Sequence, residues 1–325
     1  MQTRRHFIQG AAAMATAGSS WTAAIAQGFP AKPIRIVCPY PPGATTDAIS
    51  RLMATALQTT SGATVLVDNR DGAGGNIGTE AVARGDADGY TLLLGALGPL
   101  SANEALYPRL GFNPGRDFKP LALAAVVPLI MVAHPSFPAA TPAEAVKLLR
   151  ANPGKYAYAS AGNGTPQHLA GELFKQVTAT DFVHVPYRGS GPALNDAMGG
   201  QVQLLFEASP AVLQHIKSGR LKALAVTTRE RIAGLPGVPT LKESGIDADI
   251  GGWYGFLAPA ATPADRVAWL SEQMRRALAD PLVQTRLADL GSQKVDSSPQ
   301  AFARLIDAER ARWGQLIRER GIRLD

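Results

Sequence analysis

The sequence contains a single cysteine, Cys38, in 325 residues. One cysteine excludes an internal disulfide and a cysteine-rich metal site. Histidine is scarce too, and no histidine pair has the spacing of a zinc motif. His168 and Glu172 lie four residues apart in an expected helix, and we interpret them as a hydrogen-bonded pair because two ligands do not make a metal site. We therefore expect no metal and no other cofactor.

Catalytic signatures are missing as well. The chain has neither a Gly-x-Ser-x-Gly nucleophile elbow nor a His-Glu-x-x-His motif. Cys38 ends an apolar stretch, where we expect a small buried residue rather than a nucleophile. Asp47 follows two threonines at the start of an expected helix, so capping of the first turn fits it better than a role as a base. These features favour a binding protein over an enzyme.

Long apolar runs and basic runs are absent from most of the chain. Beyond the N-terminal segment, no run reaches the roughly 18 apolar residues of a transmembrane helix, because Pro128, His134 and Pro135 bound the longest one. Lysines and arginines are scattered and only 6% of the residues are aromatic, so we expect no nucleic-acid partner. The formal net charge of +6 suits a small anionic ligand instead.

The N-terminus has the features of an export signal. Residues 3–9 contain the pair Arg4-Arg5 followed by apolar residues, and residues 10–17 form a weakly apolar, alanine-rich core. Residues 24–26, Ala-Ile-Ala, match a cleavage site. We expect a signal peptide at residues 1–26 of the twin-arginine type, with an ordinary secretory leader as the alternative. The protein is then periplasmic, and its leader takes no part in the fold.

The next part of the chain alternates apolar strands with helical patterns. We expect strands at residues 34–38, 63–67 and 90–94 with helices between them, and this order predicts a parallel sheet with right-handed crossovers. Residues 99–120 are rich in Pro, Gly and Asn, and we expect them to be mostly irregular. Residues 121–133 are apolar and are expected to cross into a second lobe, as a strand pair or one bent strand.

The second lobe repeats the pattern of strand, loop and helix. Residues 250–259 are the expected return crossing, and three helices with proline at their start follow. These helices have no strands of their own, so we expect them to pack on the first lobe's sheet. The predicted fold class is α/β with two lobes, each a mostly parallel sheet flanked by helices. Residues 27–125 with 250–325 form lobe 1, and residues 126–249 form lobe 2.

Two loops of this pattern are candidates for an anion site. The first loop, residues 41–47, and the second loop, residues 160–165, each connect an apolar strand to the start of a helix. The first N–H groups of a helix lack partners within the helix and carry partial positive charge, so they attract anions. In open α/β sheets, ligands bind at the carboxyl ends of strands. Two ordinary turns are the alternative reading for each loop taken alone.

Further polar residues follow the strands of the second lobe. Tyr187 and Arg188 precede a glycine-rich turn and are candidates for lining the cleft, with Arg188 as a second carboxylate-binding group. A surface arginine beside a packed tyrosine is the alternative. Glu207 ends the next strand and is a candidate acceptor for an amine or hydroxyl of the ligand. Residues 72–78 match a dinucleotide fingerprint poorly, so we expect them to serve close backbone packing at the lobe's inner face.

The order of these motifs resembles the Bug-type extracytoplasmic solute receptors of tripartite tricarboxylate transporters. The resemblance covers almost the whole chain after the leader and rests on residues 33–37, 41–43, 47, 69–70, 72–75, 88–93, 152–155, 164–165, 168–172, 184–189, 235–236, 238–240, 259 and 313. It implies a two-lobed periplasmic binding protein of type II-like architecture that closes on a ligand. It also implies a carboxylate held between the two loops, partly through water, and transient docking on the subunits of a membrane permease.

Three residues depart from the family pattern. Ala44 stands where a second Gly is usual, Asp71 replaces a common Pro, and Glu207 stands where a shorter Asp often ends the strand. These departures concern the identity of the ligand and not the fold.

The leader, the two loops and the resemblance together predict a monomeric receptor for a small carboxylate. A ligand-sensing receptor for a membrane signalling kinase is the alternative, with an exported hydrolase using Asp47 or Cys38 as a further one. The candidate ligand-binding residues are Tyr40, Pro41, Gly43, Ala44, Thr45, Thr46, Asp47, Ser160, Ala161, Gly162, Asn163, Gly164, Thr165, His168, Tyr187, Arg188 and Glu207.

Overall fold

The computed structural model describes residues 28–293 and 295–323. The expected leader and its cleavage site lie outside the described residues. The chain divides into an N-terminal unit ending at Ala31 and a second unit that begins at Lys32 and contains every helix and strand reported below. No helix in the described part of the chain has the length and apolar character needed to cross a membrane.

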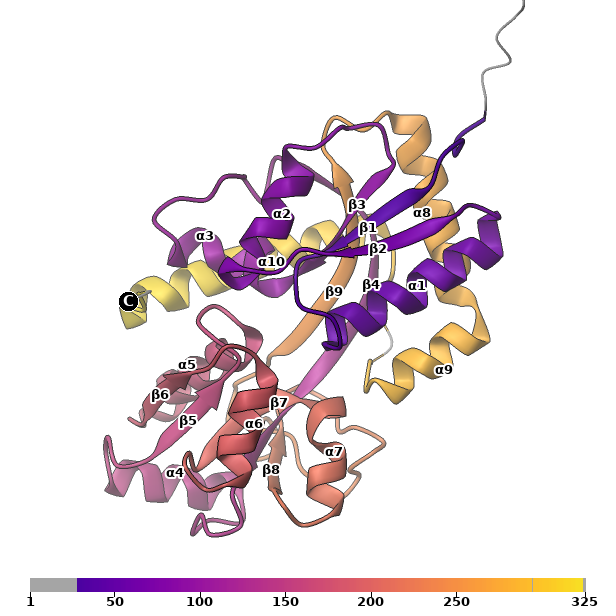
Figure 1. Ribbon diagram of the computed structural model, residues 1–325. Coiled ribbons are helices and arrows are strands. Elements are labelled where there is room, and N and C mark those ends of the chain that lie inside the picture. The colour runs from indigo at the N-terminus through magenta and orange to yellow at the C-terminus, as the bar shows by residue number, and fades with distance from the viewer. Residues whose placement is uncertain (1–27, 294, 324–325) are drawn as a thin grey trace, which may run out of the picture. The chain divides into compact units, whose positions relative to one another are not determined.

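The first part of the sheet confirms the expected parallel arrangement (Figure 1). Strands β1 (Ile34–Cys38), β2 (Val65–Asn69) and β3 (Thr91–Ala96) are parallel, with β1 in the middle. Helices α1 (Thr45–Ser61) and α2 (Asn76–Ala83) connect them. The second strand begins two residues later than the sequence predicted. Because the three strands run in the same direction, the first loop, which follows β1, lies at their shared carboxyl edge.

The strand β4 (Phe118–Ala133) is one continuous element of 16 residues. It pairs antiparallel with β9 (Gly251–Pro259) as far as Pro128 and with β7 (Leu204–Ala208) from Leu129 onward. Its pairing with β9 shifts register twice, which bends the strand. Figure 1 shows β4 running from one part of the sheet into the other. The sequence left a strand pair open for this segment, and the structure shows a single bent strand.

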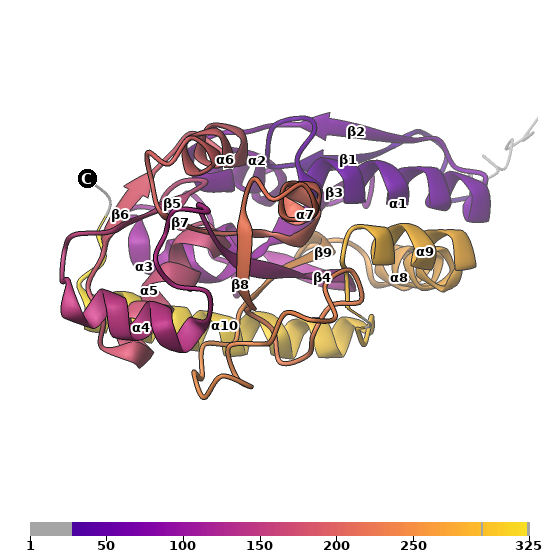
Figure 2. The ribbon, with the colours of Figure 1, turned by 90° about the horizontal axis from the view of Figure 1, so that it is seen from below.

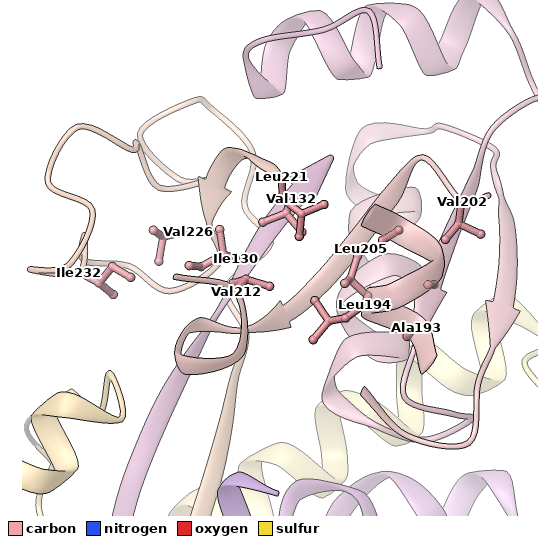
Figure 3. Close-up of a cluster of buried hydrophobic side chains, with 12 residues drawn as sticks. Ile130, Val132, Ala193, Leu194, Val202, Leu205, Val212, Leu221, Val226 and Ile232 are labelled. Atoms are coloured by element: carbon pink, nitrogen blue, oxygen red, sulfur yellow. The ribbon is translucent and has the colours of Figure 1, made fainter. Parts of the chain in front are cut away.

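The second part of the sheet is built on β4. Strand β7 lies beside β5 (Ala157–Ser160), which is parallel both to it and to β6 (Val183–Pro186), while β8 (Lys222–Val226) pairs with β4. The helices are α4 (Pro142–Ala151), α5 (Pro166–Thr178), α6 (Ser190–Met198) and α7 (Ser209–Lys217). Apolar side chains from β4, β7, α6 and α7 form one buried cluster (Figure 3).

The three C-terminal helices begin at or directly after the prolines that the sequence predicted, Pro263, Pro281 and Pro299. They are α8 (Ala264–Ala279), α9 (Pro281–Asp289) and α10 (Pro299–Arg320). Helix α8 contacts α1 and β4, α9 contacts α1, and α10 contacts β4, which confirms their packing on the first lobe (Figure 2). Helix α10 also reaches α5, where Gln176 donates a hydrogen bond of 2.8 Å to Glu319.

Residues 99–120 are less irregular than the sequence suggested. A turn of π-helix, η2 (Gly98–Ala102), leads directly into a short helix, α3 (Asn103–Leu106). Seven of these nine residues are buried, Glu104 and Ala105 being the exceptions, and α10 covers them. Proline and asparagine mark breaks in regular structure, but here the contact with α10 stabilises helical turns that local preference does not favour.

Gly255 provides a test of how tightly α10 packs on the bent sheet. A Cβ atom at this position would lie 2.4 Å from the ring of Phe302 and 2.7 Å from the carbonyl oxygen of Ala122. We expect Gly255→Ala to lower the free energy of unfolding by about 1–3 kcal/mol through overpacking. Gly237→Ala is the matched control, because nothing lies within 4 Å of its Cβ. Equal urea midpoints for the two variants would contradict the tight packing.

Candidate ligand site at two helix N-termini

The first loop is held in shape by Asp47, whose side chain is buried. One carboxylate oxygen accepts hydrogen bonds of 3.0 Å from the N–H of Gly43 and from Arg51 Nε, and the other accepts one of 3.0 Å from Asn69 Nδ2. Burial by itself would raise the pKa of Asp47, but these hydrogen bonds together lower it. Asp47 therefore stays ionised and orders the loop, whereas the expected capping of the first turn is wrong because its carboxylate bonds to Gly43, two residues before the helix.

This arrangement leaves the start of α1 open to a ligand. The residue before the helix, Ala44, has extended backbone angles and supplies no side-chain cap. No acceptor among the described residues pairs with the backbone N–H groups of Thr45 and Thr46. Residues 41–44 are exposed, and Gly43 adopts φ of 85°. The loop thus presents unpaired donors at the positive end of a helix dipole.

The second loop satisfies more of its own donors. Gly162 N–H donates to Ser160 Oγ at 3.1 Å, Gly164 N–H donates to His168 Nδ1 at 3.1 Å, and Thr165 N–H donates to the Gly162 carbonyl at 3.3 Å. Thr165 caps α5 as well, by accepting from the His168 N–H. No acceptor in the described part of the chain pairs with the N–H groups of Ala161 and Asn163. The second loop is therefore preorganised and offers fewer donors than the first.

A stack of three aromatic rings, those of Tyr158, His184 and His168, packs beside the second loop. The rings of Tyr158 and His184 are stacked with centroids 4.8 Å apart, and those of His184 and His168 are 4.2 Å apart. His184 Nε2 lies 2.7 Å from Ser160 Oγ. Burial lowers the pKa of His168 to about 4 and, together with the neighbouring His168, that of His184 to about 3. Both rings are thus neutral at pH 7, and each fixes one residue of the loop.

The expected hydrogen bond between His168 and Glu172 is wrong. His168 Nδ1 accepts from the second loop, whereas Glu172 accepts from Tyr158 Oη at 2.9 Å and lies 3.0 Å from Lys175 Nζ. Residues four apart do share a helix face, but each of these side chains has a partner from another element. Which partner each side chain takes depends on the packing of β5 and β6 against α5, and the spacing of residues along a helix does not reveal this packing.

The second loop lies directly against the first lobe. A Cβ atom on Gly164 would lie 2.6 Å from Asn103 Oδ1 in α3, and one on Gly98 would lie 3.2 Å from the Gly164 carbonyl oxygen. Gly74 in the 3₁₀ turn η1 (Ala73–Gly75) lies close to the Asn163 carbonyl in the same way. The expected close packing of residues 72–78 is therefore confirmed. The two lobes approach each other through glycine backbone at this point.

Asn103 belongs to this contact, and the sequence reasoning missed it. Its side chain is fully buried and donates to Asn76 Oδ1 at 2.7 Å and to the Gly74 carbonyl at 3.3 Å. Tyr40 reaches the same turn, where its hydroxyl donates to the Gly74 carbonyl at 3.4 Å. The only sequence signal was the density of Gly, Pro and Asn in residues 98–103, which we took for an irregular segment.

The remaining candidate residues differ in how free they are. Tyr187 packs against the buried cluster of Figure 3 and donates to Asp196 at 2.7 Å, and its burial and this hydrogen bond raise its pKa to about 12. Arg188 is exposed and forms no salt bridge with any described residue. Glu207 is buried at the end of β7. Of these three, only Arg188 and Glu207 have polar side-chain atoms without a partner among the described residues.

Cys38 is buried at the end of β1, as the sequence predicted. Its Sγ lies 3.7 Å from the Tyr40 carbonyl oxygen, and burial raises the pKa of the thiol. A buried thiol with a raised pKa is a poor nucleophile. In the described residues no three His, Cys, Asp or Glu side chains gather as a metal-binding group.

Comparison with known proteins identifies the family. Residues 49–322 match the model of the tripartite tricarboxylate transporter family receptor, so the chain belongs to this family of solute-binding receptors. It is 37% identical to the protein BugT of Bordetella pertussis over 92% of this chain and 92% of BugT. The resemblance to Bug-type receptors is thereby confirmed.

Solved structures confirm the two-lobed α/β fold of periplasmic binding proteins. One is an R. palustris protein solved with adipate, which is 33% identical, superposes with a TM-score of 0.84, and matches over 91% of this chain and 100% of that one. Another is MatC of Rhodopseudomonas palustris with bound malate, which is 32% identical with a TM-score of 0.80 over 89% of this chain and 100% of MatC.

The stacked histidines predict a loss of stability in acid. Below pH 6.5 the unfolded chain protonates both residues, whereas the folded chain keeps His168 neutral to about pH 4 and His184 to about pH 3. The unfolded state then binds more protons than the folded state. The contribution of these histidines to the free energy of unfolding is therefore fully present above pH 6.5 and is lost as the pH drops toward 4. The expected slope is at most about 1.4 kcal/mol per pH unit for each histidine, measured by urea unfolding.

A variant isolates this effect from the titration of carboxylates. In His168→Asn the shorter amide keeps a hydrogen-bond acceptor but cannot take a proton, so the slope between pH 6.5 and 4 should decrease. His134→Asn, which changes a histidine outside the stack, should keep the slope of the unmodified protein. An unchanged slope in His168→Asn would show that the stack does not govern the acid response.

Proposed function

We propose that this protein is a periplasmic receptor that binds a small carboxylate between two lobes, residues 27–125 with 250–325 and residues 126–249. The observation that carries the proposal is the open start of α1, where the N–H groups of Thr45 and Thr46 have no acceptor among the described residues. In this proposal the second loop faces the first, and its N–H groups of Ala161 and Asn163, which have no acceptor among the described residues, are further donors. A carboxylate is an anion of the size that such donors accept.

The expected strength of this site is in the range of a solute receptor. A helix N-terminus contributes about 0.3–1 kcal/mol to a nearby anion, and up to about 2 kcal/mol when partly buried. Each hydrogen bond from a backbone N–H to a carboxylate adds about 1.5–3 kcal/mol. A few such bonds, less the cost of association, give about −8 kcal/mol, which corresponds to micromolar affinity. No lysine, arginine or metal ion is required.

The relatives support the ligand class and the partner. The R. palustris structure with adipate and MatC with malate both contain small carboxylates. The family name supports delivery of the ligand to a membrane permease of the tripartite tricarboxylate type. In this proposal the chain is exported, loses its leader near Ala26, acts as a monomer and docks transiently on the permease.

Gly43 provides a test of the first loop. Its φ of 85° is a conformation that β-branched residues avoid, although no atom lies within 4 Å of its Cβ position. Gly43→Val should therefore displace the loop and lower the affinity for carboxylates at least tenfold. The protein should stay folded, with a stability loss of about 1–2 kcal/mol. Calorimetric titration with a panel of carboxylates, adipate and malate included, measures the affinity.

Gly62 offers a matched control at the other end of the same helix. It caps the C-terminus of α1 with φ of 70°, and nothing lies within 4 Å of its Cβ position either. Gly62→Val should cost similar stability and leave the affinity unchanged. Retained affinity in Gly43→Val, or an equal loss in both variants, would count against the role of the first loop.

A further inference from the structure

The carboxylate of Glu207 is buried with one oxygen unused. The side chain is only 1% exposed. Its Oε1 accepts hydrogen bonds from Gln167 Nε2 at 2.9 Å and from the N–H of Ala208 at 2.8 Å. Its Oε2 has no hydrogen-bond partner among the described residues. A buried carboxylate oxygen without a donor is unfavourable, and proteins keep such groups chiefly where function requires them.

The surroundings of Glu207 hold its carboxylate in one orientation. Gln167 is the second residue of α5, and its amide also reaches Ser190 Oγ at 3.4 Å at the start of α6. The Ala208 N–H fixes the same oxygen from the backbone of β7. These contacts order Oε1 and leave Oε2 without a hydrogen-bond partner in the described part of the chain. Burial raises the pKa of Glu207, although the Ser190 hydroxyl is close enough to help lower it, and no lysine or arginine is among the described groups that oppose this shift.

Glu207 lies at the ligand-facing edge of the second lobe. Strands β5 and β7 are parallel neighbours, so the end of β7 lies beside the end of β5, where the second loop begins. Its contact Gln167 belongs to the first turn of α5, directly after the second loop. Glu207 therefore lies beside the second loop, and in the proposed site it faces the part of a ligand beyond its carboxylate.

We propose that Glu207 selects carboxylates that carry a hydrogen-bond donor, an ammonium or a hydroxyl group, which reaches Oε2. This inference rests on the proposed carboxylate-binding function and specifies its ligand class. A donor group completes the hydrogen bonding of the buried oxygen, whereas a ligand that brings only a second carboxylate places like charges together. Amino- and hydroxycarboxylates are then preferred over their analogues without a donor.

Matched ligand pairs test this in the unmodified protein. Calorimetric titration would compare succinate with malate and aspartate, glutarate with 2-hydroxyglutarate and glutamate, and benzoate with 3-hydroxybenzoate. Within each series the carboxylate and the carbon skeleton stay constant. We expect at least one donor-bearing ligand to bind tenfold or more tightly than its donor-free analogue. This measurement needs no variant, so it does not depend on the folding of one.

The variant Glu207→Gln then assigns the preference to this residue. It keeps the volume of the side chain but removes the negative charge, so the ratio of affinities between donor-bearing and donor-free ligands should fall at least fivefold. Glu230→Gln is the matched control, because it makes the same change at an exposed position outside the site. It should leave the ratio unchanged.

The outcomes separate this inference from the proposed function. If donor-free carboxylates bind as tightly as their donor-bearing analogues throughout, or if the ratio persists in Glu207→Gln, the role of Glu207 is overturned while carboxylate binding stands. If no carboxylate of either kind binds, both the proposed function and this inference are overturned.

Discussion

The backbone N–H groups at the start of a helix require acceptors, and the candidate site depends on how this requirement is met. At α5 the Thr165 hydroxyl accepts from the His168 N–H, and Ser160 and His168 accept from N–H groups of the loop before the helix. At α1 the N–H groups of Thr45 and Thr46 have no acceptor among the described residues, and Asp47 bonds instead to Gly43 before the helix. The remaining donors of the first loop are ordered but unpaired. An anion then gains hydrogen bonds at sites that have already lost their conformational freedom.

The bent strand β4 joins the strands before these two helix starts into one nine-stranded sheet. It leaves its pairing with β9 at Pro128 and enters pairing with β7 at Leu129. The two parallel groups of strands thus share a continuous backbone connection, and the second loop comes against Gly74, Gly98 and Asn103. Glycine is needed at these contacts because any side chain would hold the two backbones apart.

Much of the fold could be predicted from the sequence because its signals are local. Apolar runs predicted the strands, and proline with a preceding capping residue predicted the starts of α4, α9 and α10. The first and second loops could be recognised from glycine between a strand and a helix. Helix α3 and Asn103 could not be predicted, because contact with α10, about 200 residues later in the chain, stabilises a segment with poor local preference.

For the site, the sequence determined which groups are available, and the tertiary structure decided which of them are free. Tyr187, His168 and Asp47 all have suitable chemistry, yet each uses its polar atoms on a neighbour in the fold. Glu207 has one oxygen without a hydrogen-bond partner among the described residues. A hydrogen bond requires that distant segments place donor and acceptor within a few tenths of an ångström of about 2.9 Å. Residue type and spacing therefore determine which polar groups the site contains, and only tertiary packing determines which of them remain without a partner.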